Sequence, residues 1–243
     1  MAEGPKRLRF NFASLQKELE AIVDLAGPFL TAESVRRLQQ SKYWLASLKS
    51  QPGKRVTWSV PSDEPIRTRE SEGEYEAKDG GKGPIVEGAL SFVWDMETSP
   101  KSVTEVELIG KASTMIRLCE KSGDTHRELS TWKMEIGIGA AESPGCFFHV
   151  QMPSQLPVPR LPIFPPTPMV CMEFLLGELF QRDWQRRVDG DGQSMTIWRG
   201  VQRDRLGRFF QWQQEQLKGG GSPLMHLKGF PGPDLFVGPS PTV

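Results

Sequence analysis

The stretch LSFVWDME, at residues 90–97, decides how this chain folds, because large apolar side chains alternate with small or polar ones along it. The even positions hold Leu, Phe, Trp and Met, and the odd positions hold Ser, Val, Asp and Glu. Successive side chains of a strand point to opposite faces of its sheet. The pattern therefore predicts a half-buried strand whose even-numbered residues face the core.

The same parity continues along the chain as far as residue 152. Residues 104–118, 130–138 and 146–152 place most of their apolar side chains at even positions and most of their charged ones at odd positions. Short links join these segments, which favours an antiparallel meander, and residues 55–60 are a candidate fifth strand. Because the odd positions are more polar, we expect one face of the sheet to be wetter than the other.

Helical spacing of apolar residues flanks the predicted sheet on its N-terminal side. Residues 12–26 and 32–49 each carry an apolar stripe, with Asn11 and Thr31 as candidate N-caps. The short link between the two stripes favours an antiparallel helix pair.

The C-terminal side begins with a proline-rich strap, residues 153–168, which holds too many prolines for a helix or a central strand. Thr167-Pro168 then begins a helix, with Thr as N-cap and Pro at the first helical position. A last helix is expected over about residues 194–217. The predicted fold class is α+β, with an N-terminal helix pair, a four- to five-stranded antiparallel meander, the strap and two C-terminal helices.

The chain is divided into segments by these patterns. Residues 1–53 form the helix pair, residues 54–152 form the sheet, and residues 153–218 pack with the sheet in one compact domain. Within the sheet segment, residues 61–85 are rich in Glu, Asp and Gly and are expected to be a mobile loop, because they cannot bury enough apolar surface to offset their ordering entropy. Residues 219–243 are predicted to be a Gly/Pro-rich tail.

Composition and charge limit the function. Lys plus Arg and Asp plus Glu both number 30, so the formal net charge is zero, which excludes a strongly basic nucleic-acid-binding chain. The three cysteines form no CxxC pair and are odd in number, which argues against a disulfide framework. No signal-peptide pattern and no run of about 18 apolar residues occurs, so we expect a cytoplasmic protein that does not enter the membrane.

His149 and Glu135 are the candidate catalytic pair. Both lie at odd positions, and pairing of residues 129–138 with 145–152 would set them directly or diagonally opposite each other. A carboxylate beside a histidine orients the ring and holds its proton, which is the start of a general acid–base site of a hydrolase or nuclease. Glu107 is the other candidate carboxylate. No third catalytic group accompanies them in the sequence, and a solvated sheet face with cross-strand ion pairs accounts for the same residues.

Two surfaces are candidates for binding. Arg117, Lys133 and Gln151 share the odd, polar face of the sheet.

The C-terminal helices form the second surface, because they interleave arginine with tryptophan. Arg199 and Arg203 are four residues apart and share a helix face beside Trp198. Arginine with aromatic rings can bind phosphates and stack bases, but it is also typical of protein–protein contacts.

No metal or cofactor is expected. The three histidines stand at no HxH, HxxxH or HExxH spacing, and the glycine-rich runs lack the phosphate-loop pattern. The patterns favour a non-enzymatic cytoplasmic binding or adaptor protein that acts through protein–protein contacts, with the apolar residues of the tail as one means of docking. The alternatives are a hydrolase or nuclease that uses His149, and nucleic-acid binding through the arginine-rich helices.

Overall fold

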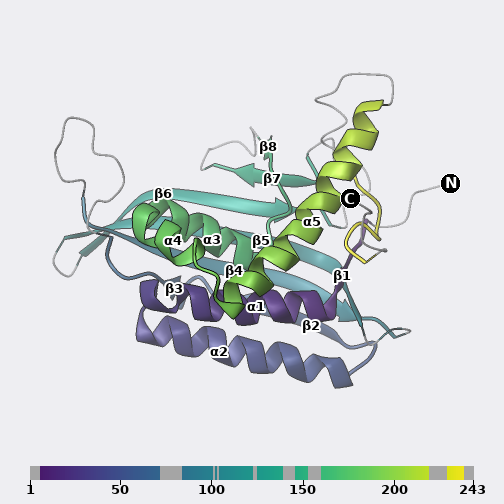
Figure 1. Ribbon diagram of the computed structural model, residues 1–243, viewed down its shortest axis with the longest axis horizontal. Coiled ribbons are helices and arrows are strands. Elements are labelled where there is room, and N and C mark those ends of the chain that lie inside the picture. The colour runs from purple at the N-terminus through teal and green to yellow at the C-terminus, as the bar shows by residue number, and fades with distance from the viewer. Residues whose placement is uncertain are drawn as a thin grey trace.

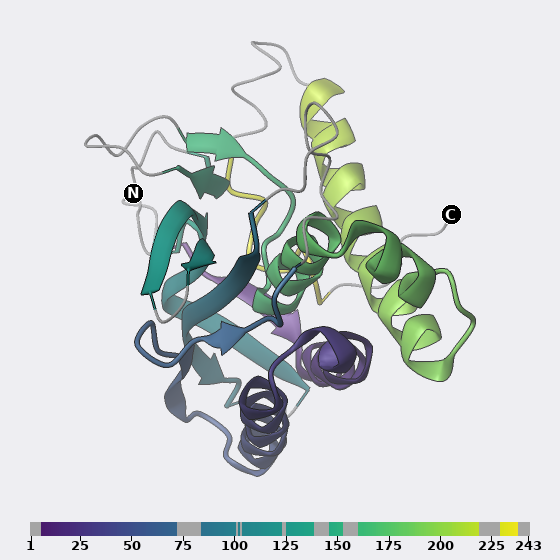
Figure 2. The same ribbon diagram turned by 90° about the vertical axis from the view of Figure 1, so that its left-hand side faces the viewer.

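The computed structural model is an α+β fold with helices on one face of an eight-stranded antiparallel sheet (Figures 1 and 2). The residues that it describes are 6–71, 84–100, 102, 104–122, 125–138, 146–152, 160–218 and 229–237. The strand order is β2-β4-β5-β6-β7-β8, with β1 beside β5 and β3 beside β4. The strands are β1 (Leu8–Asn11), β2 (Arg55–Val60), β3 (Ile66–Arg67), β4 (Val86–Thr98), β5 (Glu105–Ser122), β6 (Thr125–Ile136), β7 (Phe148–Gln151) and β8 (Arg160–Pro162).

The helices form a second layer that Figure 2 shows to one side of the strands. They are α1 (Phe12–Ala26), η1 (Gly27–Phe29), α2 (Ala32–Ser47), η2 (Leu48–Ser50), α3 (Pro168–Leu179), α4 (Gln181–Val188) and α5 (Gln193–Lys218). The predicted N-caps are confirmed, because Asn11, Thr31 and Thr167 each accept a hydrogen bond from the backbone N–H three residues on. The expected helix pair and the last helix are therefore present.

The even-numbered face of the central strands is the core, as the alternation predicts. Leu90, Trp94, Leu108 and Ile116 have no exposed surface or almost none. Helices α1 and α3 pack on this face, and Gly88 lets α3 come so close that a Cβ there would overlap Leu side chains of α3. The meander β4–β5–β6–β7 is also as predicted.

The sheet has more strands than the sequence predicts. Strands β1, β3 and β8 have four, two and three residues and lie outside the alternating segments. They pair with β5, β4 and β7, respectively. Strands of two to four residues are too short to show an alternating pattern in the sequence.

The expectation of a mobile loop over residues 61–85 is wrong for its first half. The Thr68 N–H donates to the carbonyl of Gly88 at 2.9 Å, and Ser71 exchanges backbone hydrogen bonds with Val86. Pairing with β4 and the burial of Ile66 hold this segment in place, although its composition is polar. Residues 72–83 lie outside the described part of the chain.

Three C-terminal features differ from the expectations. The proline-rich strap contributes β8 to the edge of the sheet, whereas residues 153–159 lie outside the described residues. The helix that begins at Pro168 breaks at Phe180, where the backbone leaves the helical region and α4 begins. The described part of the tail packs on the body, since the Phe236 ring stacks on Phe10 with 5.0 Å between centroids.

A buried ion pair joins the first and last long helices. The Arg205 guanidinium on α5 makes two hydrogen bonds to the Glu18 carboxylate on α1, one of them at 2.7 Å. Thr167 and Gln202 donate to the same carboxylate at 2.8 Å each. Every partner in the network is satisfied, so the two charges are accommodated inside the helical layer. Among the described residues, no helix has both the length and the apolarity to span a membrane.

Candidate functional site

His149 and Glu135 are direct cross-strand partners, as the parity predicts. The register of β6 and β7 sets them opposite each other, with 3.3 Å between Nε2 of His149 and Oε2 of Glu135. The Lys133 ammonium contacts the other carboxylate oxygen at 2.7 Å. On the far side of the ring, Nδ1 lies 2.8 Å from the carbonyl oxygen of Cys146. One carboxylate thus holds a ring and an ammonium on the odd-numbered face.

The electrostatics of this cluster favour the ionised carboxylate. Burial acts to raise the pKa of Glu135, but the contacts and charges of His149 and Lys133 outweigh it and lower that pKa to about 2. Glu135 therefore stays ionised at neutral pH and is not a proton donor there.

The expected exposure of His149 is wrong, because only 5% of the residue is accessible. Strand β8, which the alternation did not predict, pairs with β7 so that Pro162 stands opposite His149. Gln151 lies between Lys133 on β6 and Arg160 on β8. The cluster ties adjacent strands together and leaves a substrate little approach to the ring.

Glu107 does not join this cluster. It pairs in register with Arg9 of β1 and Glu97 of β4, and its carboxylate contacts Arg7 at 2.8 Å. Glu135, by contrast, pairs with Ser113, near the middle of β5. The interpretation of Glu107 as a catalytic carboxylate beside His149 is therefore wrong, because Glu107 lies six residues along β5 from Ser113, which is about 20 Å in an extended strand.

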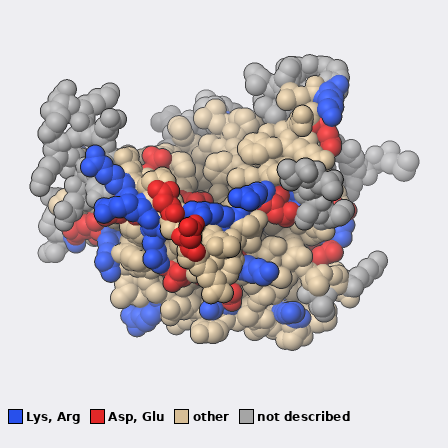
Figure 3. All heavy atoms as spheres, in the orientation of Figure 1, with Lys and Arg blue, Asp and Glu red and all other residues tan. Residues whose placement is uncertain are grey.

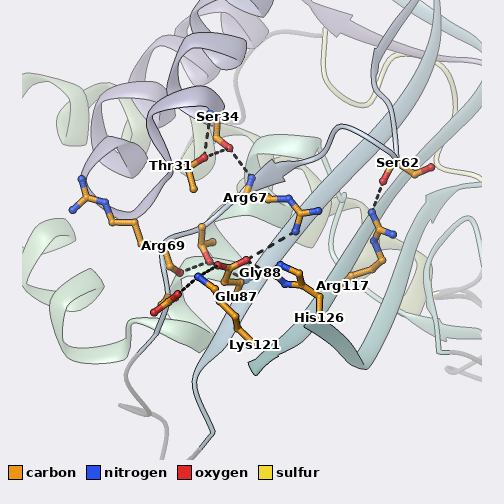
Figure 4. Close-up of polar contacts among 12 residues, drawn as sticks. Thr31, Ser34, Ser62, Arg67, Arg69, Glu87, Gly88, Arg117, Lys121 and His126 are labelled. Atoms are coloured by element: carbon orange, nitrogen blue, oxygen red, sulfur yellow. Dashed lines mark hydrogen bonds and ion pairs between the residues drawn. The ribbon is translucent and has the colours of Figure 1, made fainter. Parts of the chain in front are cut away.

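Arg117 serves the fold at the same polar face. Its guanidinium donates to the carbonyl of Ser62, in the turn that links β2 to β3 (Figure 4).

The tryptophans of the C-terminal helices are not open to a nucleic acid. Trp198 is 1% exposed, and its indole N–H donates to Glu173 at 3.0 Å. Arg199 donates to the carbonyl of Val188, whereas Arg203 is exposed. The tryptophan rings proposed for base stacking therefore belong to the packing of the helical layer.

The free edges of the sheet are a feature that the search for catalytic residues missed. Edge strands present unpaired N–H and C=O groups, which natural proteins cover or shorten. Strand β8 is three residues long and ends in Pro162. Strand β1 is covered by the C-terminal segment, because the Arg9 N–H donates to the carbonyl of Pro233 at 2.8 Å.

Strand β3 is closed by the start of α2 (Figure 4). The Arg67 N–H donates to the Ser34 hydroxyl at 2.7 Å, and the Thr31 N–H donates to the Arg67 carbonyl at 3.1 Å. Both outward backbone groups of Arg67 are thereby satisfied, and the N-cap of α2 doubles as an edge cap.

Strand β2 lies on the same side of β4 and is open. Just before the ladder, the Thr98 N–H donates to the Lys54 carbonyl at 3.0 Å and the Thr98 carbonyl accepts from the Gly53 N–H at 2.9 Å, so the backbone groups of Thr98 point toward β2. Because antiparallel ladders alternate, the next bonds to β4 come from every second residue. The N–H and C=O groups of Arg55, Thr57 and Ser59 consequently point away from β4. Apart from the β2–β4 ladder itself, the described residues offer these groups no backbone hydrogen bond, and all three residues are exposed.

A groove runs along this open edge. Its volume is about 280 Å³, and it lies between β2 and one face of α2. Trp44 on α2 and Trp58 on β2 line it, and the Trp58 indole N–H donates to Ser41 at 2.6 Å. An unpaired strand edge beside an aromatic groove offers backbone hydrogen bonds and a side-chain pocket together.

The sequence does contain one signal for this site. Residues 55–60 are predicted only as a candidate fifth strand, which precedes the meander, and a strand at the start of a sheet has a neighbour on one side unless a later segment covers it. Comparisons of the chain with protein-family models, curated proteins and solved structures find no match.

Proposed function

We propose that this protein binds an extended segment of a partner protein by strand addition along β2. The observation that carries the proposal is the open edge at Arg55, Thr57 and Ser59, beside β3, whose equivalent groups are capped. When a peptide adds to the edge of a sheet, main-chain hydrogen bonds provide the affinity, and pockets for every second side chain of the peptide provide the specificity. The function is that of a binding or adaptor protein.

The groove suggests what the partner segment carries. In an added strand, every second side chain points toward the helical layer. One such side chain would enter the groove between Trp44 and Trp58, where an apolar or aromatic group gains most from burial. The intervening side chains would lie beside Thr57 and Ser59 on the polar face. We expect a segment in which an apolar residue stands between polar neighbours.

The proposed setting is the cytoplasm. Cys119, Cys146 and Cys171 are all free, and unpaired cysteines are common in reducing compartments. The buried position of His149 and the absence of open tryptophans on the arginine-rich helices favour this protein-binding proposal over the enzyme and nucleic-acid alternatives.

A proline substitution on the open edge tests the proposal. Ser59→Pro removes an outward N–H but no donor to β4, and proline is tolerated where a strand N–H faces solvent. Ser59→Ala is the matched control, because it removes the hydroxyl and keeps the N–H. Both variants should melt close to the wild type.

The assay selects displayed random peptides on the full-length wild type and then measures their affinity for the two variants. We expect alternating peptides that bind Ser59→Ala like the wild type and bind Ser59→Pro at least about tenfold more weakly, which corresponds to the loss of about one to two hydrogen bonds. Equal binding to both variants, or selection of no peptide, would contradict the proposal. A dimer in light scattering that Ser59→Pro converts to a monomer would identify a second copy of this chain as the occupant and also contradict it.

A further inference from the structure

A second hollow lies among the helices, away from β2. Its volume is about 490 Å³, and it is bordered by η1, by α4 and the residue before it, and by the residues that follow β3. That volume falls in the range of about 300–1,000 Å³ that is usual for small-molecule sites.

The hollow combines an apolar floor with a basic rim. Phe29 and Phe180 line it, with 5.1 Å between their ring centroids, and Arg69, Arg186 and Arg187 surround them. Figure 3 shows charged side chains of both signs gathered over and beside α4. A ligand here would meet aromatic carbon below and guanidinium groups at the rim.

Backbone carbonyls hold two of the guanidinium groups in place. Arg69 donates through Nε to the Leu30 carbonyl at 3.3 Å, and Arg187 donates through Nη2 to the Asp24 carbonyl at 3.1 Å. Figure 4 shows the Arg69 side chain extending away from Glu87 and its neighbours. Because a guanidinium has five N–H donors, both arginines keep donors for a ligand.

The charge balance leaves Arg69 in excess. Three carboxylates at or beside the rim already have cationic partners, since Glu70 pairs with Lys121, Asp183 pairs with Arg186, and the Asp24 carboxylate lies 3.6 Å from Arg187. Arg69, by contrast, has no carboxylate within ion-pair distance among the described residues. An anionic group at this rim would therefore gain from an uncompensated positive charge.

We propose that this hollow binds a phosphate monoester whose organic part is a flat apolar ring. The planar fork of arginine matches phosphate oxygens bidentately. Arg69 supplies the positive charge that no carboxylate compensates, and Arg187, which is held at Asp24, supplies further N–H donors for a second phosphate oxygen. The ring would lie on the Phe29 and Phe180 floor. This site is separate from the edge of β2, so the result of this test does not affect the proposal of strand addition along β2.

Calorimetric titration of the full chain with phenyl phosphate tests the proposal, with inorganic phosphate and benzoate as comparisons. Phenyl phosphate should bind more tightly than either, because inorganic phosphate lacks the apolar ring and benzoate lacks the phosphate group. Arg69→Gln and Arg187→Gln should each weaken binding by about tenfold or more. Arg182→Gln is the matched control, because Arg182 is exposed on the same helix and does not line the hollow.

Three results would overturn the proposal. They are a dissociation constant for phenyl phosphate weaker than about 1 mM, equal affinities in Arg69→Gln and Arg182→Gln, and phenyl phosphate binding no tighter than inorganic phosphate. Melting temperatures of the variants show that each remains folded, so a loss of binding is assigned to the site.

Discussion

Replacing Arg205 by methionine should destabilise the protein strongly, because it leaves the Glu18 carboxylate buried without its cation. Glu18 has no exposed surface, and 5% of Arg205 is accessible. Removing one partner of a buried pair typically costs about 3–5 kcal/mol, out of a total stability of about 5–15 kcal/mol. For a chain of this size, each kcal/mol lowers the melting temperature by about 2–4 °C.

Urea and thermal unfolding of three variants measure this effect. Arg203→Met is the control, since Arg203 is exposed on the same helix, and it should change stability by less than about 0.5 kcal/mol. Adding Glu18→Gln to Arg205→Met should restore most of the loss, because the buried charge disappears while the amide keeps the bonds from Thr167 and Gln202. If Arg205→Met unfolds at the same urea concentration as Arg203→Met, the reasoning about buried charge is refuted.

Two further predictions concern the sheet. Phe148→Ala should lower the free energy of unfolding by about 3–5 kcal/mol, because the ring is 3% exposed and contacts Phe209. Trp132→Ala should lower it less, because Trp132 is only partly buried. Equal losses of stability in urea unfolding would contradict this difference. The pKa of Glu135 is lowered from its ordinary value of 4.5 to about 2, so the ionised carboxylate stabilises the folded state at any pH above about 4.5. This contribution, up to about 3 kcal/mol, is lost as the pH falls from about 4.5 to about 2. Glu135→Gln should therefore be less stable than the wild type at pH 7 and nearly equal to it near pH 2, and a constant difference across that range would contradict the assignment.

The alternation of the central strands was enough to predict the core face and one cross-strand pair. Even-numbered residues such as Trp94 are buried, and Glu135 stands opposite His149, because a period of two fixes which side chains share a face. The same period does not say what covers each face. His149 is buried because β8 adds beside β7, and nothing in the local pattern of a proline-rich segment predicts that pairing.

Long-range partners explain the other misjudged segments. Residues 66–71 have the composition of a loop, yet the Ser34 hydroxyl and the Gly88 carbonyl, from elsewhere in the chain, accept hydrogen bonds from their backbone N–H groups. In the sequence, Arg205 cannot be told from the other arginines of its helix, which are expected to face solvent. In the fold it pairs with Glu18 of α1, which lies 187 positions away in the sequence. The open edge of β2 is likewise a property of the assembled sheet, because it depends on which strands no later segment covers.

Amide hydrogen exchange along β2 tests the central claim most directly. In the free protein the amides of Arg55, Thr57 and Ser59 should exchange much faster than those of Val56 and Trp58, and a bound extended peptide should slow the three fast amides selectively. Uniformly slow exchange along the strand, or protection that appears only elsewhere when a peptide binds, would show that this edge is not the binding site.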